Sequence, residues 1–216
     1  MLLKTEMNLI KIIGTLLFLG AAGTPLSHAQ KINCEQANTP AFNKICHADL
    51  QEIREQLNDQ FLTAFLVTDA PLRILQDTHQ LWFKRAQQCK TTECFKQQFE
   101  ARLDQLNFFS SMNQSMTQHY LKFEQGQLAK QPVHLQIHQL NKDSIKIEGV
   151  AYRSPNNKLD TQTISLLAYT SPQQKQHIID NEHDCNYQLD FQKAYLAVRT
   201  EQKGCERFSG IYRLYD

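Results

Sequence analysis

Glycine and tryptophan are scarce in this chain of 216 residues, which has seven glycines and one tryptophan. Its formal net charge is also small, at +1. It has no glycine-rich phosphate loop, no H-E-x-x-H zinc motif and no G-x-S-x-G nucleophile turn, so common signatures of enzymes are missing. Its near-neutral charge argues against nucleic acid or an anionic membrane as partner. We therefore expect a protein that is not an enzyme and that has no cofactor and no metal site.

Residues 1–29 have the pattern of a cleavable signal peptide. A basic start precedes an apolar stretch at 10–22, and Ser27 and Ala29 occupy the −3 and −1 positions of a cleavage site. A start at Met7 or an uncleaved anchor are the alternatives, although the apolar stretch is shorter than the roughly 20 residues of a membrane span. Cleavage would leave 21 of the 23 basic and 21 of the 22 acidic residues. We expect export to the periplasm, with no stable membrane insertion afterwards.

Six cysteines follow this segment, and their even number in an exported chain predicts a disulfide framework. Six cysteines allow fifteen pairings, of which the simplest joins neighbours along the chain. A crossed pairing within the N-terminal half is the alternative. Zinc is disfavoured because the Cys-x4-Cys spacing has no matching second pair. The expected disulfides are Cys34 with Cys46, Cys89 with Cys94, and Cys185 with Cys205.

The N-terminal half has the apolar spacing of helices. Thr39 can cap a short helix with Pro40 at its first position. Further on, apolar residues recur at steps of three and four, and Gly126 ends the pattern. The expected helices cover about residues 39–47, 50–65, 71–86 and 92–123.

After residue 132 the apolar period changes to two, as Val133, Leu135 and Ile137 alternate with polar residues. Short strands separated by turn-prone segments predict an antiparallel β domain, either a meander sandwich or a small barrel. The predicted fold class is α+β. It consists of a disulfide-stapled helical domain at 31–126 followed by an antiparallel β domain at 132–216.

Several side chains with functional chemistry have simpler explanations. Trp82 lies on a helix stripe and is expected in the core. Arg85 and Arg102 are expected to pair with carboxylates at the surface, and pairing at the rim of the helical core is the alternative. His134 and His138 lie about 13 Å apart along a strand, too far to share a metal easily. His183 and Asp184 are only a weak candidate for a catalytic base–carboxylate pair, because adjacent residues of a strand point to opposite faces.

The N-terminal half also has a frame of cysteine, aromatic and apolar positions. Its members are Asn33-Cys34, Thr39-Pro40, Ile45-Cys46, Leu50, Phe61, Trp82, Cys89, Cys94, Ala101-Arg102-Leu103 and Leu106. With this frame, residues 34–106 resemble the lysozyme inhibitor LprI-like N-terminal domain, a small helical module of exported bacterial proteins. The chain departs from that family's pattern at Asn43, Arg54, His79 and Ala86. The resemblance implies a helical fold and a protein that binds and blocks lysozyme.

The segment between Cys89 and Cys94 is the first candidate binding site. A lysozyme cleft carries two carboxylates, and a rigid loop that offers a cation could plug it at a reduced ordering cost. Lys90 would be the inserted cation, and Thr91, Thr92 and Glu93 complete the loop. The loop resembles by analogy the disulfide-closed inhibitory loop of Ivy-type lysozyme inhibitors, whose histidine it lacks. The simpler alternative is a structural corner with solvated charges.

An acidic run formed by Asp180, Glu182 and Asp184 is the second candidate. It could face a strongly basic enzyme and speed the encounter, or it could be a solvated loop. The expected partner is lysozyme or another protein of the cell envelope. The alternative function is a structural or interaction module of the envelope with a partner other than lysozyme.

Overall fold

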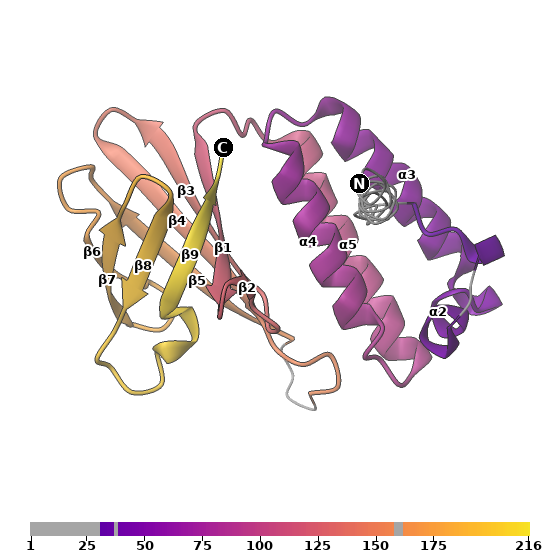
Figure 1. Cartoon of the computed structure of the whole chain (residues 1–216). Helices are drawn as coiled ribbons and strands as arrows, with labels where there is room; N and C mark the ends of the chain where they lie inside the picture. Colours follow the sequence, from indigo (N-terminus) through magenta and orange to yellow (C-terminus); the bar gives the residue numbers. More distant parts are fainter. Residues whose placement is uncertain (1–30, 37–38, 158–161) are drawn as a thin grey trace, which may run out of the picture.

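The computed structural model describes residues 31–36, 39–157 and 162–216. The predicted signal peptide therefore lies outside the described residues. A helical layer comes first in the chain and a curved antiparallel sheet follows (Figure 1). The helices are η1 (Cys34–Gln36), α2 (Pro40–Ile45), η2 (Ala48–Leu50), α3 (Gln51–Val67), α4 (Leu72–Ala86) and α5 (Thr92–Ser111).

The helices begin at the capping residues that the sequence indicates. The Thr39 hydroxyl accepts from the Phe42 amide at 3.2 Å, and Pro40 follows at the first position of α2. The Thr91 hydroxyl accepts from the Cys94 amide at 3.2 Å and starts α5. Each cap satisfies an amide that would otherwise lack a partner in the first turn.

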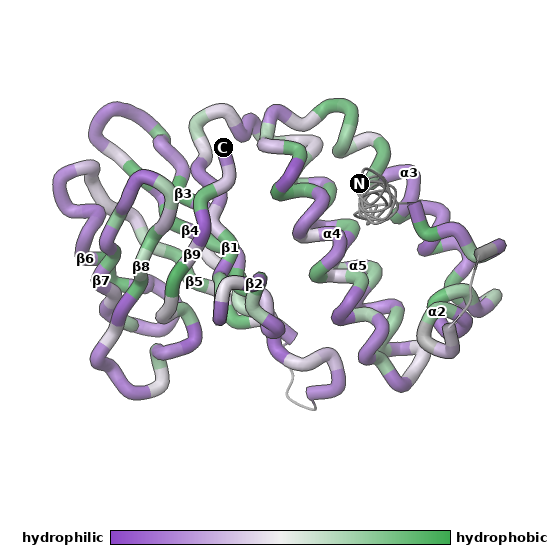
Figure 2. The backbone as a smooth tube through the Cα atoms, viewed as in Figure 1, coloured by the Kyte–Doolittle hydropathy of each residue, from purple (hydrophilic) through white to green (hydrophobic). Residues whose placement is uncertain are grey.

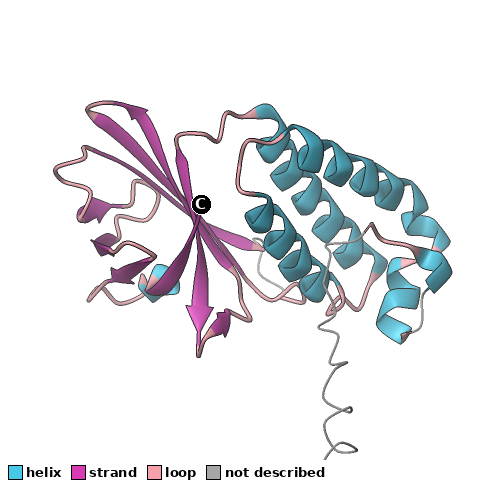
Figure 3. Ribbon diagram, turned by 45° about the horizontal axis from the view of Figure 1, so that its top comes forward, coloured by secondary structure: helices cyan, strands magenta, loops and turns pink. Residues whose placement is uncertain are grey.

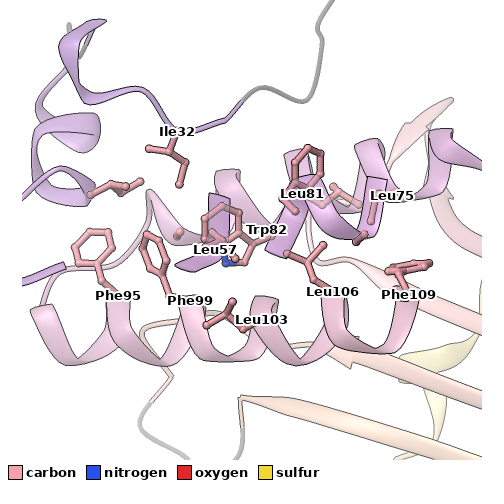
Figure 4. Close-up of a cluster of buried hydrophobic side chains, with 14 of the residues drawn as sticks. Ile32, Leu57, Leu75, Leu81, Trp82, Phe95, Phe99, Leu103, Leu106 and Phe109 are labelled. Atoms are coloured by element: carbon pink, nitrogen blue, oxygen red, sulfur yellow. The ribbon is translucent and has the colours of Figure 1, made fainter. Parts of the chain in front are cut away.

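The core of the helical layer is aromatic. Trp82 lies edge-on to Phe99, with ring centroids 5.2 Å apart, and its indole N–H donates to the Gln98 carbonyl. Figure 4 shows the buried side chains of α5 directed toward Trp82, Leu57 and Ile32. Trp82 is buried, which confirms its expected place in the core.

The sheet has nine antiparallel strands in the order β5-β4-β3-β1-β9-β8-β7-β6, with β2 paired to β1. It curls so strongly that its two edges approach each other, and Figure 3 shows the strands fanning out beside the helices. Its concave side encloses a second hydrophobic core, against which the 3-10 turn η3 (Glu206–Phe208) packs Phe208. The strands are β1 (Thr117–Glu124), β2 (Gln127–Leu128), β3 (Val133–Asn141), β4 (Ser144–Tyr152), β5 (Thr163–Thr170), β6 (His177–Ile179), β7 (Asn186–Phe191), β8 (Tyr195–Arg199) and β9 (Gly210–Tyr215).

On its convex side, the sheet packs against the helical layer around β1, β3 and β9 (Figure 1). Leu121 of β1 and Tyr215 of β9 belong to the same hydrophobic core as the helices. Phe109 of α5 packs on the imidazole rings of His119 and His134, with centroids 5.7 and 6.4 Å away. Hydrogen bonds also cross between the helical part and the part that follows it. Among them are Tyr215 Oη to Asp77 Oδ2 (2.7 Å), the Gln114 amide to Asp69 Oδ1 (2.8 Å) and Arg85 Nη2 to the Arg153 carbonyl (3.1 Å).

The structure confirms the α+β fold class, with a disulfide-stapled helical region followed by an antiparallel sheet. It corrects the predicted boundary. Helix α5 ends at Ser111, and residues 117–123, predicted as helix, belong to strand β1. The helical region is therefore shorter than 31–126, and the β region begins at Thr117 rather than at 132. Consecutive burial of His119, Tyr120 and Leu121 hid the strand, because β1 is covered on both faces.

Candidate functional site

The turn between α4 and α5 forms a closed corner at one end of the helical layer. The chain leaves α4 at Ala86 and re-enters a helix at Thr92, and a disulfide joins Cys89 to Cys94 across the turn. Both cysteines are buried, whereas the four residues between them are exposed. We refer to residues 89–94 as the 89–94 corner.

Within the corner, Lys90 is the cationic residue, and it is exposed. Thr91 uses its hydroxyl to cap α5, and Glu93 lies in the first turn of that helix, where a negative charge favours the helix dipole. None of the ion pairs between described residues includes Lys90 or Glu93. The corner thus presents one flexible cation from a backbone that the cap and the disulfide both constrain.

The loop between β4 and β5 supports one side of the corner. The Asn156 side-chain amide donates to the Gln88 carbonyl at 2.8 Å, and the Pro155 carbonyl oxygen lies 3.3 Å from Cys94 Sγ. The sheet region therefore buttresses the turn. These contacts limit how far the corner can deform.

The acidic run is only partly at the surface, so the prediction was wrong for Asp180. Asp180 is 0% exposed. Its carboxylate accepts from the amides of Leu167 (3.0 Å) and Glu182 (3.1 Å), and it lies 2.8 Å from His183 Nδ1. Since Leu167 belongs to β5 and Asp180 follows β6, this carboxylate joins the two edges of the curled sheet. Glu182 and Asp184 are exposed.

The histidines also have structural partners. His183 contacts Asp180 rather than its neighbour Asp184. His134 shares a hydrogen bond of 3.2 Å with His119, and His138 lies 3.0 Å from a carboxylate oxygen of Glu148. No group of three or more potential metal ligands occurs among the described residues.

Sequence reasoning missed the environment of Arg85 and Arg102. Both were expected at the surface with carboxylate partners, but their exposed fractions are 5% and 1%. They lie between the helices and the sheet, where they line a cavity with Tyr152 and His134. A charged residue on a helix is usually exposed, so the sequence alone gave little reason to place them there.

The opposite end of the helical layer has exposed apolar side chains. Leu62, Leu66 and Val67 project from the end of α3, and Met112 and Met116 follow α5. Figure 2 shows the hydrophobic segment at the end of α3. We refer to these five residues as the apolar end. Helix α4 separates it from the 89–94 corner by about 22 Å, given 15 residues at 1.5 Å each.

Comparison with known proteins identifies no relative, since no family model, curated protein or solved structure matches the chain. The resemblance to the LprI-like domain therefore stays a prediction from the residues. All three expected disulfides are present, and they indicate folding in an oxidising compartment. Among the described residues, no helix has the length and apolar character needed to span a membrane.

Proposed function

We propose that this protein is an exported, periplasmic member of the LprI-like family that binds lysozyme and blocks hydrolysis of peptidoglycan. The observation that carries the proposal is the 89–94 corner, which offers an unpaired Lys90 from a constrained turn. A lysozyme cleft contains two carboxylates, so a cation inserted between them gains favourable electrostatic energy. On this proposal the protein is a binding protein and not an enzyme.

The rigidity of the corner supports inhibition by insertion. A loop that is already ordered loses little conformational entropy when it binds, so more of the contact energy contributes to affinity. The disulfide, the Thr91 cap and the Asn156–Gln88 hydrogen bond all order the corner before a partner arrives. The remaining exposed acids, Glu182 and Asp184, can assist the approach of a basic enzyme.

The test is lysis of peptidoglycan by a c-type lysozyme, followed by turbidity, with increasing amounts of the oxidised protein that begins at Gln30. The proposal predicts inhibition that saturates near one protein per enzyme. Absence of inhibition against c-, g- and i-type lysozymes would overturn it.

Two lysine variants then locate the inhibitory surface. Lys90→Ala should weaken inhibition at least tenfold, because it removes the inserted charge. Lys96→Ala is the matched control, since Lys96 is also exposed and lies near the start of α5, just after the corner. This variant should retain inhibition. Equal potency of both variants would exclude the corner as the inhibitory site. Any inhibition would then come from another surface.

The second candidate is an interaction module of the envelope with a partner other than lysozyme. The apolar end favours it, because grouped apolar side chains at a surface commonly mark protein interfaces. Leu66→Ser separates the two functions. That variant should leave lysozyme inhibition unchanged if the corner is the site, because the apolar end lies at the other end of α4.

A further inference from the structure

An open groove crosses the outer face of β6, β7 and β8, on the side of the sheet away from the helices (Figure 1). Its volume of about 750 Å³ is in the range of ligand-binding sites. The buried side chains of these strands belong to the sheet core, and since side chains alternate along a strand, the exposed residues between them face the groove. We refer to it as the sheet groove. Exposed residues that line it include His177, Ile179, Asn186, Gln188, Arg199 and Glu201.

Three of these polar side chains form a row across the strands. His177 is opposite Gln188 in the register of β6 and β7, and Gln188 is opposite Arg199 in that of β7 and β8. Opposite residues of an antiparallel pair lie on the same face of the sheet. In a second row beside the first, Ile179 is opposite Asn186. The sheet therefore fixes the positions of these side chains relative to one another.

The first row has free hydrogen-bonding capacity. Among the described residues, no hydrogen bond or ion pair involves the side chain of His177, Gln188 or Arg199. Glu201 adds a carboxylate to the same lining. A ligand can therefore bond to an imidazole, an amide and a guanidinium without first breaking contacts within the protein.

The mixture of groups favours an uncharged ligand that is rich in hydroxyl groups. An amide, a guanidinium and a carboxylate can each donate to or accept from a hydroxyl, and the charges of Arg199 and Glu201 offset each other. Ile179 is 59% exposed and can pack on the apolar face of a sugar ring. A polyanion would need several cations, whereas the described residues of the groove include no lysine and no second arginine.

The spacing of the strands favours an extended sugar chain over a single sugar. Neighbouring strands are about 4.8 Å apart, so the row from His177 to Arg199 spans about 10 Å. A β-1,4-linked chain of pyranose rings is extended, and its repeat is close to this strand spacing, so one ring can meet each strand. The described lining has no exposed aromatic ring for stacking. Each ring should therefore bind weakly, and affinity should grow with chain length.

We propose that the sheet groove binds a linear, uncharged β-1,4-linked polysaccharide that lies across β6, β7 and β8. Gln188 and Arg199 form hydrogen bonds with the sugar hydroxyls, and Ile179 packs against a ring. The groove shares no residue with the 89–94 corner, so this binding does not depend on the proposed inhibition of lysozyme.

The test is co-sedimentation of the oxidised protein that begins at Gln30 with colloidal chitin, in the absence of lysozyme. Chitin is an insoluble β-1,4-linked polymer that carries no peptide, and insoluble starch, with α-1,4 linkages, is the control polymer. The proposal predicts retention on chitin and not on starch. Equal retention on both polymers, or no retention on chitin, would overturn it.

Variants of the row locate the binding surface. Gln188→Ala and Arg199→Ala should each weaken retention on chitin about tenfold, because each removes hydrogen bonds to the chain. Gln127→Ala is the matched control, since Gln127 is exposed on β2, outside the groove, and it should bind like the unaltered protein. Unchanged retention of both row variants, or an equal loss in the control, would contradict the site.

A second measurement does not require any variant to fold. Soluble oligomers of N-acetylglucosamine, added to the unaltered protein labelled with nitrogen-15, should shift the amide resonances of β6, β7 and β8. Longer oligomers should bind more tightly than shorter ones. Shifts confined to other segments, or an affinity that does not depend on chain length, would contradict a chain laid across these strands.

Discussion

At the scale of single residues, the buried polar side chains of this protein hold its parts together. Asp180 joins two sheet edges and Arg102 joins two helices, each through hydrogen bonds to backbone groups. The sequence did not predict this, because charged residues are usually exposed and their partners are distant along the chain. Trp82 was predicted correctly, since it belongs to an apolar stripe that is visible locally.

Replacement of Asp180 should open the curled sheet. Asp180→Ala leaves the Leu167 and Glu182 amides without their acceptor, and the free energy of unfolding should fall by about 3 kcal/mol. Asp184→Asn is the control, because Asp184 is exposed and asparagine also tolerates the left-handed backbone of this position (φ 55°), and its effect should stay within about 0.5 kcal/mol. Urea unfolding measures both. Equal effects would show that the carboxylate of Asp180 does not close the sheet.

Three buried histidines predict a loss of stability in weak acid. Burial lowers the pKa of His79 to about 3 and that of His119 to about 4, and it also lowers the pKa of His134. The unfolded chain, in which histidine has a pKa near 6.5, therefore binds more protons than the folded protein below that pH. The free energy of unfolding should decrease as pH falls from about 6.5 to 5, before most carboxylates titrate.

Urea unfolding across this pH range measures the effect, and His79→Gln should reduce the number of protons taken up on unfolding by about one. A flat profile between pH 6.5 and 5 would contradict the neutral, buried state of these rings. A His79→Gln profile with the unaltered slope would exclude His79 as one of the contributing groups.

At the scale of elements, local signals predicted most helix starts. Burial on both faces of the sheet hid strand β1 and, with it, the end of α5. The Thr39 and Thr91 caps are readable in the sequence because the cap and its amide are three residues apart. The end of α5 was not readable, since the apolar residues of β1 extend the spacing of the helix. In β1, Tyr120 faces the sheet core and Leu121 faces the helices, so the alternation that marks a half-buried strand is absent.

The two disulfides that close turns should have different effects when removed. Replacing Cys89 and Cys94 with serine should cost about 2 kcal/mol and weaken lysozyme inhibition, because the corner loses its order. Replacing Cys185 and Cys205 should cost about 3 kcal/mol, since the closed segment is longer (20 against 5 residues of separation), but should leave the inhibition of the folded protein unchanged. Urea unfolding and the lysis assay separate these outcomes, and equal loss of inhibition in both would contradict a specific role for the corner.

At the scale of the whole molecule, the helical layer and the sheet share a core and should unfold together. The sequence suggested two domains because the apolar period changes once along the chain. It could not show that Leu121 and Tyr215 of the sheet complete the helical core. Such contacts between distant segments leave no local pattern.

We therefore predict one cooperative thermal transition. Fluorescence of Trp82, which reports on the helices, and the infrared amide band of the sheet should have the same midpoint. Two separated midpoints would show that the layers are independent domains.

We propose that the 89–94 corner occupies the substrate cleft of lysozyme. The most direct test is calorimetric titration of a c-type lysozyme with this protein, with and without a saturating oligosaccharide of N-acetylglucosamine in the cleft. Competition for the cleft predicts that the apparent Kd rises by a factor of one plus the ratio of the oligosaccharide concentration to its own Kd. Unchanged affinity, with both ligands bound to the enzyme at once, would contradict it.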